Sequence, residues 1–374
     1  MVQDFKKSTH WDKGLGCVDC HGGDPTSGDV AVAMDPAIGF VGKPTGGQIL
    51  DTCTKCHANP EYMKQFGNMR TDQLELYKTS IHGKRFFENG DMNVAFCSDC
   101  HSPHLIAPAS NPQSSTHHEN IPATCGKCHA DKSLMSAYGI DADIVSDYMA
   151  GRHGELLFKE KETAAPVCTS CHGYHGAAPP GVDSVVNVCG SCHLRTEQYY
   201  AQGPHNEAFK AMSFPRCITC HDNHKLKKPT DEFITSTEKG GCLSCHDTKS
   251  AAYATINTIK TSLAGLNELH EECLTLVEET EKTTHLSMTD MLPKVEEITT
   301  KLLTARGLQH SVDGKLISDN HKEAESIYME IKSFTTKLIS RGRQAKRTVL
   351  ILGALVFAYG LLMLYYTKVV LGNR

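Results

Sequence analysis

The sequence has little tryptophan, no excess of basic residues and no apolar run at its start. It holds one tryptophan in 374 residues, and its formal net charge of −5 provides no basic excess. Nucleic-acid-binding proteins use such an excess to neutralise phosphates, so no nucleic-acid partner is expected. The first residues, MVQDFKKSTHWDK, contain no apolar run of the kind found in secretory signal peptides. Two explanations stay open: a leader that has been removed, or numbering that starts inside a precursor.

Cysteine and histidine, by contrast, are abundant and unevenly placed. The chain has 17 cysteines and 21 histidines, and all the cysteines except Cys273 fall within residues 17–245. These cysteines form eight C-x-x-C pairs, each followed directly by histidine. The eight motifs are Cys17/Cys20/His21, Cys53/Cys56/His57, Cys97/Cys100/His101, Cys125/Cys128/His129, Cys168/Cys171/His172, Cys189/Cys192/His193, Cys217/Cys220/His221 and Cys242/Cys245/His246.

C-x-x-C-H is the attachment pattern of covalent haem c, in which the histidine is the proximal iron ligand. A zinc site needs four ligands and gives no reason for a histidine after every second cysteine. A disulfide framework gives no such reason either. The motifs therefore predict eight covalently bound haems c. Because haem c is attached outside the cytoplasmic membrane, they also predict a haem domain on the periplasmic side.

The motifs fall into repeats with a fixed order. Three stretches each contain a lone histidine, then C-x-x-C-H-x-x-H, then a plain C-x-x-C-H. The start of the chain is a degenerate fourth copy, in which Asp24 replaces the last histidine of the longer motif. We expect the spare histidines of the repeats, together with His117 or His118, to be distal iron ligands. The spare histidines are His10, His82, His104, His153, His175, His205 and His224.

The longer motif places its second histidine three residues after the first. Three extended residues span at most about 10 Å, and His101 already occupies one face of its own haem. The short chain cannot readily pass around the porphyrin edge, so we expect His104 to ligate a neighbouring haem, and His175 and His224 likewise. Two imidazoles leave the iron no open position, which predicts one-electron transfer.

Beyond Thr248 the cysteine pairs stop and long helices are predicted. Apolar residues recur at intervals of three and four. They form three runs: Ile256, Ile259, Leu263, Leu266, His270, Cys273, Val277 and Thr280; then Met288, Met291, Val295, Ile298, Leu302 and Ala305; then His321, Ala324, Tyr328, Ile331 and Leu338. Ser318 or Asp319 is the expected cap of the third helix.

The histidines and the last cysteine of this part are not expected to be ligands. His270 and Cys273 lie on the apolar face of the first run and are expected in the core. His285, His310 and His321 are expected on the surface.

The stretch TVLILGALVFAYGLLMLYYT, residues 348–367, carries no charge. A helix of this length spans about 30 Å, the thickness of the bilayer hydrocarbon. It predicts one transmembrane helix; a buried soluble helix is the alternative. Arg341, Arg343, Lys346 and Arg347 flank it on the haem side, against the positive-inside rule. Covalent haem nevertheless requires that side to be periplasmic, which predicts a single-pass protein of the bacterial cytoplasmic membrane.

The expected fold class is mainly α with much irregular loop. The expected domains are residues 1–247, an octahaem cytochrome c domain of four dihaem units; residues 248–345, a hairpin or stalk of long helices; and residues 346–374, the transmembrane helix and a short tail.

The units SIHGKRFF, CSDCHSPH and CGKCH, with the opening THWDKGLGCVDCHGGDPT, resemble periplasmic multihaem cytochromes c of the cytochrome c3-like, doubled C-x-x-C-H type. The likeness covers about residues 5–247. It implies a subunit of a quinol-linked complex, with a cytochrome b-type or other quinone-reactive membrane partner and a periplasmic electron carrier. Relatives often carry a histidine where this chain reads DVAVAMD. Met34 there is expected in the core, with a His/Met iron ligand as the alternative.

The expected function is a non-catalytic electron-transfer subunit without catalytic residues. The alternative is an octahaem oxidoreductase that acts on a small nitrogen or sulfur compound at one five-coordinate haem. Nitrite reductase-like octahaem proteins usually have a C-x-x-C-K motif, whereas all eight motifs here end in histidine. An open iron would be sought in the degenerate first unit.

Overall fold

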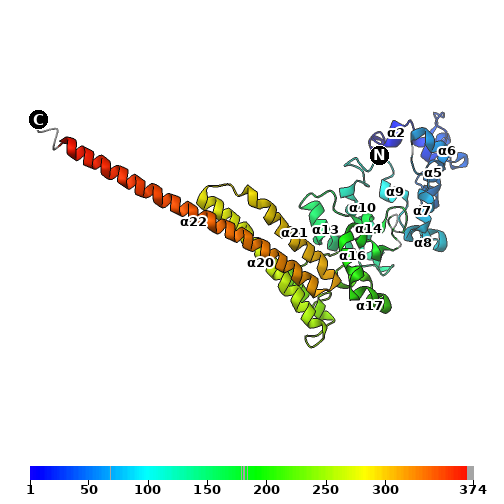
Figure 1. Ribbon diagram of the computed structural model, residues 1–374. Coiled ribbons are helices and arrows are strands. Elements are labelled where there is room, and N and C mark those ends of the chain that lie inside the picture. The colour runs from blue at the N-terminus through cyan, green and yellow to red at the C-terminus, as the bar shows by residue number, and fades with distance from the viewer. Residues whose placement is uncertain (68, 178, 180–181, 183, 369–374) are drawn as a thin grey trace. The chain divides into compact units, whose positions relative to one another are not determined.

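The computed structural model describes residues 1–67, 69–177, 179, 182 and 184–368. The described residues form helices, turns and loops but no strand, as predicted for a mainly α protein (Figure 1). The chain divides into two compact units. Unit 1 comprises residues 1–192 and 215–228, and unit 2 comprises residues 193–214 and 229–374. The domain division at residues 247 and 345 follows motifs rather than packing and stays a prediction.

Unit 1 consists of short helices joined by loops. Its α-helices are α1 (Val2–Phe5), α2 (Thr9–Asp12), α3 (Cys17–His21), α4 (Val30–Ala33), α5 (Gly47–His57), α6 (Pro60–Met63), α7 (Gln73–Thr79), α8 (Ile81–Asn89), α9 (Cys97–His101), α10 (Ile121–His129), α11 (Lys132–Ser136), α12 (Ile144–Ala150), α13 (Arg152–Phe158), α14 (Cys168–His172), α15 (Cys189–Cys192) and α18 (Arg216–Cys220). Its 3-10 helices are η1 (Pro36–Ile38), η2 (Lys64–Phe66), η3 (His118–Asn120) and η4 (Val185–Asn187).

Two small apolar clusters occupy equivalent places in successive repeats of unit 1. One buries Leu50, Val94 and Phe96 beside Cys97. The other is built from Ile121, Leu157, Ala165 and Val167, beside Cys125 and Cys168. Both clusters reach the first cysteine of a longer motif, so each core supports the chain at a haem attachment point.

Unit 2 contains three long helices, α20 (Ala252–Thr284), α21 (Leu292–Leu308) and α22 (Gly314–Tyr366), which pack on one another (Figure 1). Its other elements are α16 (Leu194–Gln202), α17 (Pro204–Met212), α19 (Asp231–Ile234), η5 (Cys242–Ser244), η6 (Thr289–Met291) and η7 (Gln309–Ser311). The predicted runs form its core: Leu266, Ile298 and Ile331 are fully buried, one from each helix. Cys273 is also fully buried, as expected.

The third long helix begins earlier than predicted. Asp313, not Ser318 or Asp319, is its cap: the Asp313 carboxylate accepts a hydrogen bond from the backbone N–H of Leu316 at 3.1 Å. The helix then continues without interruption to Tyr366. The stalk and the apolar stretch are therefore one helix.

The end of α22 is apolar and exposed. Its most apolar 18-residue window has a mean hydropathy of 2.2, and none of it is buried within the protein. Among the described residues, α22 is the one helix long and apolar enough to cross a membrane. A window that is not buried within the described chain does not fit the alternative of a buried soluble helix, so α22 is a candidate membrane anchor.

Three single-residue expectations are wrong. Met34 is 54 % exposed at the end of α4 and is not a core residue. His310 and His321 are half-buried rather than on the surface. Both belong to the long-helix region: His310 lies in η7, and the ring of His321 packs against Gly265 of α20. His285 is exposed, as expected.

Candidate haem sites

Six pairs of histidine rings face one another with similar spacing. Each pair joins the histidine of a C-x-x-C-H motif to one spare histidine. The ring centroids are 5.9 Å apart in His10–His57, 6.3 Å in His21–His104, 6.2 Å in His82–His129, and 6.0 Å in His101–His175, His172–His224 and His205–His246. Two metal–nitrogen bonds of about 2.0 Å plus the two ring radii give about 6 Å. The rings thus fit an iron held between them.

The pairs follow two rules, which define two kinds of site. In a linked site, the proximal histidine belongs to the first motif of a repeat and faces a histidine from the next repeat. His21–His104, His101–His175 and His172–His224 are linked, with interplanar angles of 19°, 21° and 13°. In a local site, the histidine of a plain motif faces the lone histidine of its own repeat. His10–His57, His82–His129 and His205–His246 are local, with angles of 56°, 55° and 35°.

The motifs of linked sites begin short helices. Cys97 is the first residue of α9, and the Asp99 carboxylate accepts a hydrogen bond from the backbone N–H of Phe96 at 2.7 Å. Asp19 repeats this contact with Gly16 at 2.7 Å. The contact caps the helix start, and the helix then holds both cysteines on one side of a single turn. Two of the plain motifs instead end longer helices, at His57 in α5 and His129 in α10.

The chain turns sharply after the proximal histidine of a linked site. Gly22, Ser102 and Gly173 each adopt a positive φ, of 67°, 64° and 72°. At Gly22 a Cβ atom would also lie 2.2 Å from the carbonyl oxygen of Gly39, so only glycine fits there. This left-handed residue ends the helix and redirects the backbone, which lets the next histidine, such as His104, reach another site.

The lone histidine of a local site stands at the second position of a helix. This holds for His10 in α2, His82 in α8 and His205 in α17. Ser80 caps α8: its hydroxyl accepts a hydrogen bond from the backbone N–H of Gly83 at 3.0 Å. A Cβ atom on Gly83 would lie 2.0 Å from the carbonyl oxygen of Tyr77, in the preceding helix. The glycine after the histidine therefore permits a tight corner.

Tyrosine is a further member of the repeat that we did not predict. Tyr77 and Tyr148 each precede the lone histidine by five residues, as Tyr200 does in the last repeat. The Tyr77 hydroxyl donates to the carbonyl of Ala95 at 2.9 Å, and that of Tyr148 donates to Pro166 at 2.9 Å. Both acceptors lie two residues before a longer motif. The tyrosines could have been predicted from the sequence, because each of the three lies five residues before a lone histidine.

Cysteines of consecutive motifs lie close together in unit 1. The side chain of Cys53 lies beside that of Cys97, and the side chain of Cys125 beside that of Cys168. Burial raises the pKa of Cys100 to about 11, with a further contribution from Cys125. The second motif therefore adjoins the third, and the fourth adjoins both the third and the fifth. Haems on these motifs would follow one another in chain order.

Two predicted attachment cysteines, Cys56 and Cys245, differ from this arrangement because their sulfur atoms contact hydroxyl groups. Cys56 shares a side-chain hydrogen bond with Tyr62, which follows it in α6. Cys245 is exposed, and its Sγ lies 3.8 Å from the Oγ of Ser244. A hydroxyl can donate to the sulfur of a thioether as well as to that of a thiol. These contacts are therefore compatible with haem attachment but do not establish it, and the roles of Cys56 and Cys245 stay predictions.

Three of the motif and spare histidines in these pairs favour the neutral form that binds iron. Burial lowers the pKa of His82, His101 and His172, and the neighbouring histidine lowers each one further. The Nδ1 of His21 contacts the carbonyl oxygen of Val41 at 2.9 Å, which fixes the ring and directs Nε2 the other way. The Nδ1 atom of His129 is buried and has no hydrogen-bond partner among the described residues.

Some predicted ligands are not in these pairs. His118 uses its Nε2 in a contact of 2.8 Å with the carbonyl oxygen of Ala165. His117 precedes it as the cap of η3. His153, His193 and His221 are also outside the six pairs, and their roles stay predictions.

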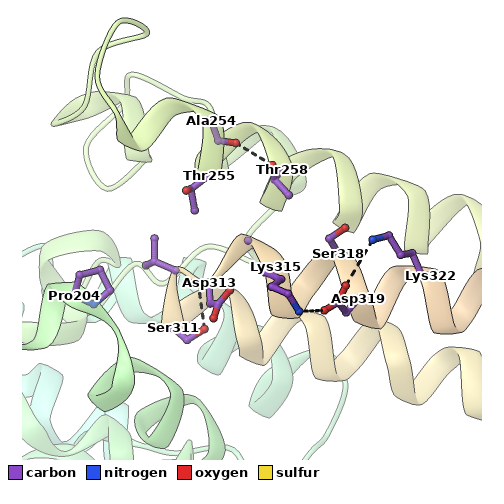
Figure 2. Close-up of a pocket in the computed structure, with 12 residues that line it drawn as sticks. Pro204, Ala254, Thr255, Thr258, Ser311, Asp313, Lys315, Ser318, Asp319 and Lys322 are labelled. Atoms are coloured by element: carbon purple, nitrogen blue, oxygen red, sulfur yellow. Dashed lines mark hydrogen bonds and ion pairs between the residues drawn. The ribbon is translucent and has the colours of Figure 1, made fainter.

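Other site types find little support among the described residues. No group of three or more histidine, cysteine, aspartate or glutamate side chains there is arranged to hold a metal ion. Axial haem ligands come in twos, whereas a zinc site needs four. A cleft of about 730 Å³ lies between α17, α20 and the start of α22 (Figure 2). Its lining has neither histidine nor cysteine, and Lys315 and Lys322 both pair there with Asp319.

Together, the motifs and the faced histidines define a multihaem c-type cytochrome, which holds its haem covalently. Residues 9–130 match the family model for cytochrome c3. The chain is 29 % identical over 210 residues to the multiheme cytochrome MtrA of Shewanella baltica, covering 53 % of each protein. It is 27 % identical over 156 residues to the cytochrome c-type protein NrfB of Escherichia coli O6:H1, covering 41 % of this chain and 64 % of that protein. No solved structure matches the chain significantly.

The matches leave part of each relative uncovered. The chain spans about half the length of the first relative and just under two thirds of the second.

Proposed function

We propose that this chain holds eight haems c, with every iron between two histidines, and relays single electrons along them. The observation that carries the proposal is the set of six ring pairs with centroids 5.9–6.3 Å apart. Each pair joins one motif histidine to one histidine outside the motifs. The eight motifs of the sequence supply sixteen cysteines for attachment.

The protein's part in this function is to position and insulate the haems. Haem supplies the one-electron chemistry, and two axial imidazoles leave no site for a substrate. Buried neutral histidines keep the iron six-coordinate, and the adjoining motifs, such as those of Cys53 and Cys97, keep successive haems together. The order of the motifs along the chain is then the order of the electron path in unit 1.

The exposed apolar end of α22 supports a membrane anchor. We infer a single pass through the cytoplasmic membrane with the haems on the periplasmic side, where haem c is attached. The span carries no histidine, so the anchor cannot hold an axial imidazole. A cytochrome b-type or other quinone-reactive membrane subunit would exchange electrons with the haems, and a periplasmic carrier would complete the chain.

The competing function, reduction or oxidation of a small nitrogen or sulfur compound at an open iron, has less support. The degenerate first repeat was the place to expect such an iron, since Asp24 replaces a histidine there. Yet His21 of that repeat faces His104 from the next one. Asp24 stands at the position that, in the later repeats, supplies a histidine to the repeat before it.

Three experiments test the proposal. Haem content and intact mass of the purified protein are expected to give eight haems per chain, and fewer would contradict the count. Removal of residues 346–374 is expected to release the protein from membranes with its haem spectrum unchanged, and continued membrane retention would contradict the anchor. Purification of the full chain in mild detergent is expected to recover a quinone-reactive membrane protein with it.

A further inference from the structure

Four exposed basic residues of α22 stand directly before its uncharged stretch. They are Arg341, Arg343, Lys346 and Arg347. Arg343 precedes Lys346 by three residues and Arg347 by four, so these three share one side of the helix. No aspartate or glutamate occurs in residues 331–367. The part of α22 that leads into the uncharged stretch therefore carries charge of one sign only.

Several basic residues of the long-helix bundle, by contrast, have acidic partners. The ion pairs there include Lys282–Glu278, Lys294–Glu330, Lys301–Glu323 and Lys315–Asp319. Within the part of the chain that the structure describes, none of the four basic residues before the uncharged stretch forms an ion pair. Their charges are thus available to a partner outside this chain.

The packed part of the bundle ends at the level of these residues. The Nζ of Lys346 donates a hydrogen bond to the carbonyl oxygen of Thr283 at 3.3 Å. A Cβ atom on Gly342 would lie 3.6 Å from the Cγ2 of Thr284, the last residue of α20. The turn that follows α20 exposes Leu286, and α22 continues alone beyond it (Figure 1). The basic residues and an exposed apolar side chain therefore lie at the same end of the bundle.

We propose that this end of unit 2 is a binding surface for the headgroups of anionic phospholipids. At 1.5 Å per residue, residues 341–347 occupy about 10 Å of helix directly before the span. The headgroup region extends roughly 5–7 Å beyond the hydrocarbon core on each side. Long lysine and arginine side chains extend toward that region, and an arginine can bind one phosphate through two N–H groups. The inference rests on the membrane anchor proposed above.

The position of the basic residues decides between a lipid and an acidic protein as the partner. They directly adjoin the span, so headgroups surround the helix at this depth whenever the span is in a bilayer. Each lysine or arginine near an anionic bilayer surface raises the affinity about fivefold, a gain that a lipid without net charge does not give. The contact holds the end of the bundle at the membrane surface and gives the four charges a partner on the haem side.

The test is the lipid preference of the full-length holoprotein in mild detergent. Phosphatidylglycerol and phosphatidylcholine are added in equal amounts, and native mass spectrometry counts the lipids that stay bound. The unaltered protein is expected to retain mainly phosphatidylglycerol. Arg343→Gln/Arg347→Gln is expected to lower this preference more than about tenfold. The matched control, Lys332→Gln/Lys337→Gln, removes two charges farther from the span and is expected to change it less than about twofold.

A conservative variant separates loss of charge from loss of the fold. Arg343→Lys/Arg347→Lys is expected to keep the preference, and all variants are expected to keep their haem content and their retention in membranes. The proposal is overturned if the unaltered protein retains both lipids equally, or if the control loses as much preference as Arg343→Gln/Arg347→Gln.

Two further outcomes separate this surface from the anchor and from a protein partner. If Arg343→Gln/Arg347→Gln released an acidic protein from the complex without changing the lipid preference, the surface would bind protein and the lipid proposal would be wrong. A full chain that membranes do not retain would contradict the anchor and the lipid surface together. Equal binding of both lipids by a chain that membranes do retain would contradict the lipid surface alone.

Discussion

Linked and local sites solve the same coordination problem in opposite ways. A local site draws both histidines from one repeat, as His82 near the start of α8 and His129 at the end of α10 do. A linked site takes its second histidine from the next repeat, after a left-handed turn. Local sites thus hold a single repeat together, and linked sites join successive repeats. The ring planes also differ, by 35–56° in local and 13–21° in linked sites.

The largest expected effect comes from removing one ligand of each kind. His104→Ala is expected to open the iron of His21 and also to release the first repeat from the second. His82→Ala opens the iron of His129 within one repeat. We expect His104→Ala to lower the free energy of unfolding by about 2 kcal/mol more than His82→Ala does. Thermal unfolding followed at the Soret band and limited proteolysis near the N-terminus measure the difference. Equal losses would contradict the division into linked and local sites.

A tight corner is expected to matter nearly as much at local sites. Gly83→Ala would place a Cβ atom 2.0 Å from the carbonyl oxygen of Tyr77, and the required shift would move His82. We expect a loss of about 1–3 kcal/mol, with partial high-spin character at this haem. Gly28→Ala is the control, because nothing lies within 4 Å of its Cβ position. A Gly83→Ala protein as stable and as fully low-spin as the control would show that the corner does not position the ligand.

The tyrosine contacts connect the two kinds of site and are expected to have a smaller effect. Tyr77→Phe removes the hydrogen bond to Ala95, which lies just before the linked motif of Cys97. Leaving that carbonyl without its partner is expected to cost about 1–2 kcal/mol in chemical unfolding. Tyr174→Phe, at a ring that is 62 % exposed, is expected to cost less than about 0.5 kcal/mol. If both variants lost the same free energy of unfolding, the hydrogen bond of Tyr77 would have no structural role in the repeat.

The smallest effect is a pH dependence shared by the local ligands. Burial lowers the pKa of His10, His82 and His205, so the folded protein binds fewer protons than the unfolded chain below pH about 6.5. The stability these histidines contribute is therefore present above that pH and falls as the pH drops through the folded-state pKa values. Acid titration followed by the low-spin spectrum is expected to show full ligation at pH 7 and loss only well below 6.5. Loss of ligation near neutral pH would contradict the neutral, buried state of these rings.

Spacing and chain reach predict the motif count, the lone histidines and the crossing of His104 to another site. His10, His82, His104 and His205 each face a motif histidine, and the haem roles of these residues stay predictions. The apolar periodicity likewise predicted which faces of the long helices are buried. Spacing alone does not reveal contacts between distant segments. The pairing of His104 with the degenerate first repeat and the half-buried position of His310 depend on how the chain folds back, and no local pattern encodes that.

Two errors have a clear physical origin. Met34 was expected in the core because it is apolar, yet it ends a four-residue helix that packs little and is 54 % exposed. Ser318 and Asp319 were good caps by residue type, but Asp313 precedes them and accepts the hydrogen bond from Leu316 first. Once a helix has begun, later capping residues simply become part of it.

The spacing of the cysteines predicts which of them attach haem, but it does not predict their contacts with other side chains. It groups Cys56 and Cys245 with the other attachment cysteines, because both complete a C-x-x-C-H motif. It does not reveal that their sulfur atoms contact the side chains of Tyr62 and Ser244. Such contacts depend on the local path of the chain around each motif, which the spacing of the cysteines does not specify.

EPR of the oxidised full-length protein, with spin quantification, tests the central claim most directly. The account predicts eight low-spin haems in two groups, since the angle between axial ring planes differs between linked and local sites. A high-spin signal that binds nitrite or hydroxylamine would contradict it, because it would reveal an iron without its second histidine.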